Sequence, residues 1–136
     1  MLHNVISDQQ GRYIILHISI FQQRCTLVTL YGPNADSPEF FTNLKENLIN
    51  WKLSNQPIML CGDWSVVLNY HNDTINYLKE NNPNAQKSVL ELIDTFELDD
   101  VYRDQEPARR SYTWSAYNNL KQDFIFSRIY RSSRFS

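Results

Sequence analysis

Two neighbouring stretches of alternating apolar residues constrain the fold of this chain more than any other feature. In residues 13–21, every even-numbered position from 14 to 20 is Ile or Leu, and the opposite face is also mostly apolar. Residues 24–31 alternate again after the pair Gln22-Gln23. Because side chains alternate between the two faces of a strand, this pattern predicts an antiparallel hairpin. Since both faces are apolar, we expect both to be largely covered.

Two amphipathic helices are predicted on either side of a short buried strand. Ser37-Pro38-Glu39 is typical of a helix start, with Ser as the N-cap and Pro at the first helical position. The second helix is predicted at about residues 85–98, and the strand at 57–61. The residues expected to pack on the sheet are Phe40, Leu44 and Leu48, flanked by Phe41 and Trp51, and Val89, Leu92, Ile93 and Phe96.

The remaining segments complete a layered architecture. Residues 69–84 are polar and rich in Asn, which predicts a loop or a loosely ordered short helix. Tyr112-Thr113-Trp114-Ser115 and residues 123–127 are predicted as two closing strands. The order β-β-α-β-α-β-β indicates an α/β (α+β) fold, and we expect residues 1–136 to form a single domain.

One carboxylate stands at a position where layered α/β proteins bind ligands. The run Ile58-Met59-Leu60-Cys61 leads through Gly62 to Asp63, so Asp63 leaves the carboxyl end of a buried strand. Active sites of such proteins gather at strand ends. Asp63 is therefore a candidate for chemistry, and the alternative is that it only caps the next turn. The residues offer no support for a zinc site or a Ser-His-Asp triad, because the three His have no partner at suitable spacing.

Composition narrows the classes of protein that the chain can belong to. No apolar run approaches membrane-spanning length, and the first residues lack the features of a secretion signal. Cys25 and Cys61 sit in apolar runs and are interpreted as reduced thiols, so we expect an intracellular protein, nuclear or cytoplasmic. Residues 1–100 carry a net charge of −6 and residues 101–136 a net charge of +4. Such a basic segment suits a phosphate-facing surface or a merely solvated one.

Four short segments, taken in order, resemble a known superfamily. They are Leu30-Tyr31-Gly32-Pro33-Asn34, Gly62-Asp63-Trp64-Ser65, Tyr112-Thr113-Trp114-Ser115 and Lys121-Gln122-Asp123-Phe124-Ile125-Phe126-Ser127. This series resembles the endonuclease/exonuclease/phosphatase superfamily. Within it, the chain is most similar to the apurinic-type endonuclease domain of non-LTR retrotransposons. The resemblance implies part of a two-sheet sandwich flanked by helices, DNA as the partner, and an original fusion to a reverse transcriptase.

The resemblance also implies roles for individual residues. Asp63 matches the aspartate that orients and deprotonates the attacking water, and Tyr31 matches a tyrosine beside the scissile phosphate. Asp123 matches an aspartate at or near the metal. Ser65 replaces an asparagine of the catalytic set, while Asn34, Thr113 and Lys121 match positions that shape the phosphate site. An aspartate pair suits a hard cation, Mg²⁺ or Mn²⁺.

Three departures from the family pattern lower the expected activity. Ser65 has a shorter reach and fewer hydrogen-bonding groups than the family's Asn. Residues 1–10 contain neither the family's Asn-x-Asn-Gly strand nor its metal-binding Glu, and no His follows His71. Without a metal or an imidazolium, the carboxylates at the site would repel a phosphate. We therefore expect a truncated domain with low or absent hydrolytic activity.

Two other functions remain open at this point. One is a non-catalytic nucleic-acid-binding or interaction domain on the same fold, using the basic residues 101–136. The other is a phosphatase of the same superfamily. The family's phosphatases need the same Glu and His as its nucleases, so the departures weigh equally against that alternative.

Overall fold

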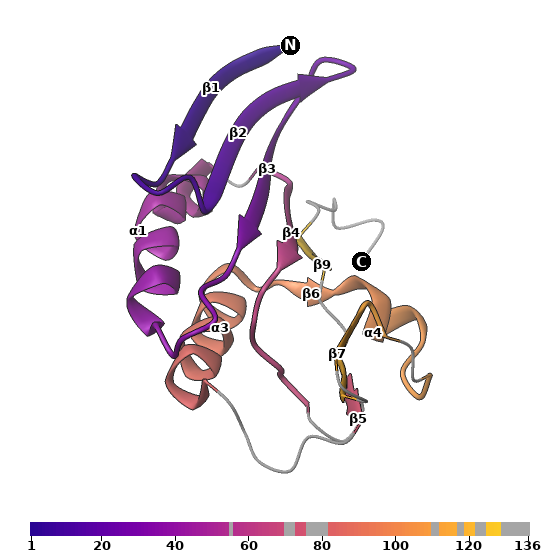
Figure 1. The fold of residues 1–136 in the computed structure, drawn as a ribbon. Coiled ribbons are helices and arrows are strands. Elements are labelled where there is room, and N and C mark those ends of the chain that lie inside the picture. Colours follow the sequence, from indigo (N-terminus) through magenta and orange to yellow (C-terminus); the bar gives the residue numbers. More distant parts are fainter. Residues whose placement is uncertain are drawn as a thin grey trace.

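The computed structural model describes residues 1–54, 56–69, 73–75, 82–109, 112–116, 119–121 and 125–128. They form a mixed α/β fold, which confirms the predicted class (Figure 1). None of the helices in these ranges is long and apolar enough to cross a membrane.

A six-stranded sheet organises the molecule, in the order β1-β2-β3-β4-β9-β6. Its strands are β1 (Leu2–Ser7), β2 (Tyr13–Ile20), β3 (Gln23–Tyr31), β4 (Ile58–Asp63), β6 (Asp99–Asp100) and β9 (Ile125–Arg128). All neighbouring strands are antiparallel except β3 and β4. The parallel pair is connected through helix α1 (Pro38–Ser54), so β3 and β4 end at the same edge of the sheet.

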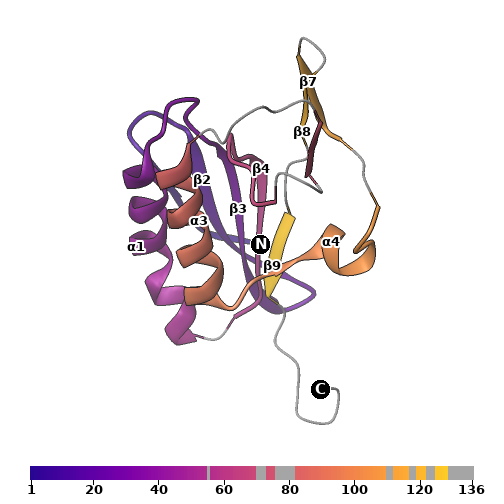
Figure 2. The ribbon, with the colours of Figure 1, turned by 90° about the horizontal axis from the view of Figure 1, so that it is seen from below.

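A smaller three-stranded sheet stands beside the large one (Figure 2). It consists of β5 (Thr74–Ile75), β8 (Asn119–Lys121) and β7 (Trp114–Ala116), all antiparallel. The short helix α4 (Val101–Gln105) precedes it in the chain. Asp73, next to β5, is buried and forms an ion pair with Arg103 of α4, which joins the two elements.

Helices α1 and α3 (Pro83–Phe96) lie side by side on one face of the large sheet (Figure 2). The core between them and the sheet is strongly aromatic. Phe41 of α1 stacks on Trp64, and Phe96 of α3 meets Trp51 edge to face. The predicted packing residues Leu44, Leu48, Val89, Leu92 and Phe96 are buried, and Phe40 and Ile93 are partly buried against the core.

The other face of the large sheet is open, in contrast to the expectation that both faces are covered. Val5, Ile14 and Met59 lie on this face and are 50%, 37% and 42% exposed. Their strand neighbours Ile15 and Leu60 point the other way and are fully buried. The helices therefore cover one face only within the described part of the chain.

The hairpin, both long helices and the strand at 57–61 lie where the sequence predicts them. The structure adds strand β1, which the sequence analysis missed, together with β5, β6, β8 and α4. The first closing strand is Trp114–Ala116 rather than 112–115, and the second is described as Ile125–Arg128, while residues 123 and 124 of its predicted range lie outside the described part. Much of the predicted loop at 69–84 lies outside the described residues.

Candidate phosphate site at the ends of β3 and β4

The candidate site forms where the two parallel strands stop. Tyr31 and Asp63 are register partners at the last position of the β3–β4 pair. The backbone N–H of Gly32 then donates to the Asp63 carbonyl at 2.6 Å, which closes the strand pair. A phenol and a carboxylate therefore lie together at the strand ends, and the pattern at Gly62-Asp63 predicts the position of the carboxylate.

Two glycines allow this close approach of the strands. Gly62 has φ +145°, and a Cβ there would lie 2.0 Å from the carbonyl oxygen of Leu30. A Cβ on Gly32 would lie 2.3 Å from the carbonyl oxygen of Trp64. Because neither neighbour is a flexible side chain, these positions require glycine.

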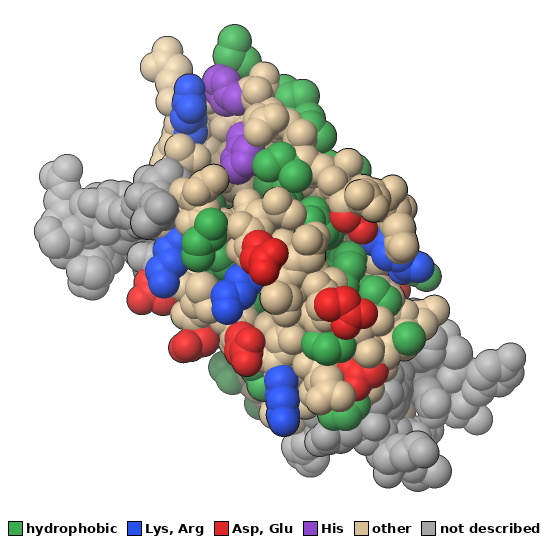
Figure 3. Space-filling model, turned by 90° about the vertical axis from the view of Figure 1, so that its left-hand side faces the viewer, with side chains coloured by type: hydrophobic (Ala, Val, Ile, Leu, Met, Phe, Trp, Pro, Cys, Tyr) green, Lys and Arg blue, Asp and Glu red, His purple; other side chains and the backbone are tan. Residues whose placement is uncertain are grey.

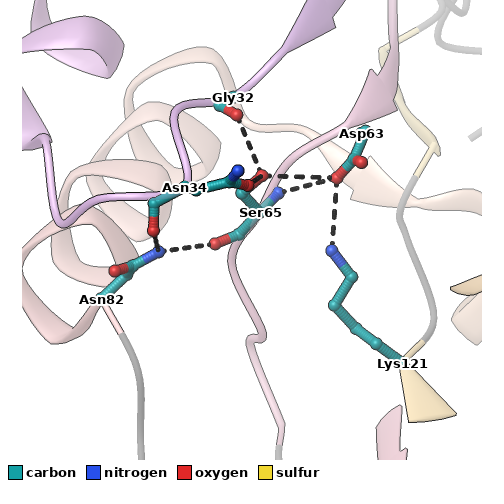
Figure 4. Close-up of polar contacts among 6 residues, drawn as sticks. All are labelled: Gly32, Asn34, Asp63, Ser65, Asn82 and Lys121. Atoms are coloured by element: carbon teal, nitrogen blue, oxygen red, sulfur yellow. Dashed lines mark hydrogen bonds and ion pairs between the residues drawn. The ribbon is translucent and has the colours of Figure 1, made fainter. Parts of the chain in front are cut away.

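The Asp63 carboxylate is held by donors from two different segments (Figure 4). Its Oδ1 accepts from Lys121 Nζ at 3.3 Å and from the Ser65 backbone N–H at 3.1 Å. The Lys121 side chain is only 7% exposed, whereas that of Asp63 is 34% exposed. A buried ammonium at the end of β8 therefore balances a partly exposed carboxylate at the end of β4.

Ser65 turns the chain immediately after Asp63. Its φ of 54° is left-handed, an uncommon conformation for a residue other than Gly. This turn directs Ser65 Oγ toward the loop after β3, where it donates to the Gly32 carbonyl at 2.9 Å. The same hydroxyl lies 3.4 Å from Asn34 Oδ1. Ser65 thus joins the two strand-end loops, and its hydroxyl is used mainly for that purpose.

Asn82 fixes the same two loops from the start of α3. Its amide nitrogen donates to the Asn34 carbonyl at 3.1 Å and to the Ser65 carbonyl at 2.9 Å (Figure 4). Asp36, in the loop after β3, holds the start of the helix in turn: its carboxylate accepts hydrogen bonds from the backbone N–H groups of Asn84 and Ala85 in the first turn. The site loops and α3 therefore hold each other in place.

Asn82, Asp36 and Arg12 are residues of this region that the sequence analysis did not select. The Arg12 guanidinium lies over the Tyr31 ring, 5.6 Å from its centroid. The only sequence signals are the Asn82-Pro83 helix start and the location of Arg12 directly before a predicted strand. Neither signal shows which segment the side chain will meet.

The predicted site residues divide into three groups. Tyr31, Asn34, Asp63, Ser65 and Lys121 come together at this edge of the sheet. Thr113 is exposed, and its backbone N–H donates a hydrogen bond to the Lys121 carbonyl at 2.9 Å. Asp123 lies outside the described residues.

The described residues of the site do not fit a divalent cation. Mg²⁺ and Mn²⁺ prefer several oxygen ligands, commonly carboxylates. Within the described ranges, no group of three or more His, Cys, Asp or Glu residues is arranged to hold a metal ion. Among the described site residues that the sequence analysis selected, Asp63 supplies the carboxylate, and its Oδ1 already faces the Lys121 ammonium. A dication bound to that oxygen would lie close to a buried positive charge.

The sheet, its helical cover and the loops at the strand ends together define the fold found in AP endonucleases and a related exonuclease. An AP endonuclease from Archaeoglobus fulgidus matches with TM-score 0.71 and 17% identity, over 93% of this chain and 58% of that one. A 3'-5' exonuclease from Neisseria meningitidis matches with TM-score 0.73 and 19% identity, over 93% and 58%. The AP endonuclease LMAP from Leishmania major matches with TM-score 0.69 and 17% identity, over 93% and 47%.

These matches establish the fold at low sequence identity. The chain spans about half to three-fifths of the length of each of the three proteins. No family model matches the sequence.

Proposed function

We propose that this chain is the central part of a phosphodiesterase-type nuclease domain that binds DNA at the ends of β3 and β4. The observation that carries the proposal is the convergence of Tyr31, Asp63, Ser65 and Lys121 at one edge of a nuclease-type fold. The resemblance of the four sequence segments to retrotransposon endonucleases supports the finer assignment. On that assignment the ligand is a DNA phosphodiester.

We expect hydrolysis by this polypeptide to be weak or absent. Cleavage requires a water made nucleophilic, stabilisation of the charge on the phosphate and a stabilised leaving oxygen. At this site the Asp63 Oδ1 is engaged by Lys121 and by the Ser65 N–H, and the Ser65 hydroxyl is bonded to Gly32. The Asp63 Oδ1 and the Ser65 hydroxyl therefore have structural partners, so we expect both to be poor activators of a water. The loss of one acid-base group typically lowers a rate about 10²–10⁴-fold.

The test is nicking of supercoiled plasmid in Mg²⁺ or Mn²⁺, with Asp63→Ala as the matched variant. We expect negligible and equal nicking by the two proteins, together with measurable binding of a labelled DNA duplex. Robust nicking that disappears in Asp63→Ala would contradict the expected loss of hydrolysis. Absence of DNA binding under all conditions would contradict the proposed function itself.

A non-catalytic nucleic-acid-binding domain is the second candidate, and the Asp63–Lys121 ion pair favours it. A salt-bridged carboxylate suits a binding site better than a site that must transfer protons. On the side of the molecule that includes α1, acidic and basic side chains are interspersed (Figure 3). Among the described residues, that side offers no single-sign surface for a phosphate backbone. Binding without nicking in the assay above is expected of both candidates, whereas nicking that Asp63→Ala abolishes would exclude this one.

A further inference from the structure

The charge balance of the strand-end site suggests how it tolerates a phosphate. Asp63 is partly exposed and carries a negative charge, which by itself would repel DNA. Lys121 places an ammonium 3.3 Å from that carboxylate, and its side chain is almost completely buried. Burial keeps this counter-charge in place and limits its screening by salt. The pair is therefore close to neutral without any bound ion.

We propose that Lys121 is a built-in cation, which gives the site the charge compensation that a divalent metal supplies elsewhere, so that DNA binds here without metal. The inference rests on the proposed function, because it concerns the same site and the same ligand. It follows from the misfit between the described residues and a dication, because neutral amide and hydroxyl groups and a buried ammonium surround the Asp63 carboxylate. Lys121 acts through Asp63 and is a positioning residue.

The first measurement is the anisotropy of a fluorescently labelled DNA duplex, titrated with the full chain in EDTA and in Mg²⁺ at the same ionic strength. We expect equal affinities in the two buffers. Binding that requires Mg²⁺ would overturn the built-in cation and leave the proposed function intact. Binding in neither buffer would instead refute the proposed function, so the two failures are distinguishable.

Charge variants then test the role of Lys121. Lys121→Met should weaken DNA binding in EDTA about tenfold at low salt, because it leaves Asp63 uncompensated. It should also make binding respond to Mg²⁺, which a purely structural lysine would not do. Lys121→Arg should retain metal-independent binding. Lys52→Met, which removes an exposed lysine from the last turn of α1, is the matched control and should change the affinity little.

A double variant separates the effect of charge on DNA binding from the effect of a disturbed structure. Asp63→Asn combined with Lys121→Met removes both charges, so it should bind DNA in EDTA about as well as the unmodified chain. Failure of the double variant to recover binding, with circular dichroism showing a folded protein, would overturn the proposal. Should Lys121→Met not fold, Asp63→Asn alone is decisive, since the remaining ammonium should then strengthen binding several-fold. Weaker or unchanged binding by Asp63→Asn would contradict the proposal.

Discussion

Single residues at the strand ends decide whether this site can form at all. Gly62 and Gly32 allow the two parallel strands to close without a steric clash, and Ser65 and Asn82 adopt left-handed conformations beside them. A concentration of unusual backbone conformations is typical of functional sites, where surrounding contacts must offset the strain. Here the hydrogen bonds of Asn82 to the two loops provide such contacts.

Replacement of Gly62 should be much more harmful than replacement of Gly11, although both have positive φ. Gly11→Ala has open space around the new Cβ and should cost only the backbone conformation, about 1–2 kcal/mol. Gly62→Ala adds a clash with Leu30 and should lower the free energy of unfolding by about 3 kcal/mol or more. Urea denaturation of the two variants measures the difference, and equal losses would show that the strands can separate at low cost.

For single residues, the sequence predicts where a side chain lies better than it predicts which side chain it contacts. Gly62-Asp63 after an apolar run is enough to place a carboxylate at a strand end. The partner of that carboxylate is not predictable in the same way, because Lys121 lies 58 residues away and was expected to face a phosphate. Asn82 and Arg12 were missed for the same reason. Their contacts depend on which segments the complete fold brings together.

Among the secondary-structure elements, long amphipathic ones were predictable and short ones were not. Helix α3 follows from its apolar spacing, and α1 from its capping sequence. Strand β1 was missed because a register shift between Leu2 and Asn4 breaks its alternation and most of its side chains are exposed. β5 and β6 have two residues each, which is too few for any period to be visible. Such strands form because their neighbours offer hydrogen-bonding partners.

The buried face of α3 should account for much of the stability of the helical layer. Phe96 is fully buried and contacts Trp51 of α1, so Phe96→Ala should lower the free energy of unfolding by about 3–5 kcal/mol. Leu90 is on the same helix and 47% exposed, and Leu90→Ala should change stability by about 0.5 kcal/mol or less. Thermal unfolding of both variants is the measurement. A Phe96→Ala variant with unchanged melting temperature would show that this packing is dispensable.

Helix α4 should add a pH dependence to folding. Burial raises the pKa of Asp100 above its ordinary value of 3.8, nearby Asp73 adds to this, and the hydrogen bond from the Arg103 N–H opposes it. A folded-state pKa above the unfolded one means that the folded protein binds the proton more tightly. The resulting stabilisation is present in full below pH 3.8 and is lost as pH rises through the folded-state pKa.

Asp100→Asn should remove this contribution while keeping a cap for the helix. Asn also accepts the hydrogen bond that Asp100 receives from the Arg103 N–H. Unfolding measured across the mildly acidic range should therefore depend less on pH in the variant. At pH 7 the variant should be at least as stable as the unmodified chain, since no charge is then buried. A steeper pH dependence in the variant would contradict the assignment.

At the scale of the whole molecule, the open face of the large sheet is the feature that most favours association with other chains. Helices α1 and α3 protect one face, while β1 to β4 expose large apolar side chains on the other. Among the described strands, β1 is also an edge of the sheet, and an edge strand presents backbone groups to which another chain can bind. Exposed apolar faces of this kind favour association.

We expect the isolated chain to self-associate with increasing concentration through this face. Ile14→Lys places a charge on the open face and should shift the sedimentation profile toward the monomer. Ile49→Lys alters a similarly exposed residue on α1, 45% against 37% for Ile14, and should have little effect. A chain that is monomeric at all concentrations, or equal behaviour of the two variants, would argue against association through the sheet.

The distant origin of Lys121 has a kinetic consequence. The β2–β3 hairpin and the β3–α1–β4 unit connect segments that are close in the chain, whereas Lys121 reaches Asp63 across 58 residues. Contacts between remote segments require the closure of long loops and usually form late in folding. During synthesis, Asp63 leaves the ribosome long before its counter-cation. The negative charge of the strand-end site should therefore be neutralised only in the last steps of folding, so that affinity for DNA signals a completed fold.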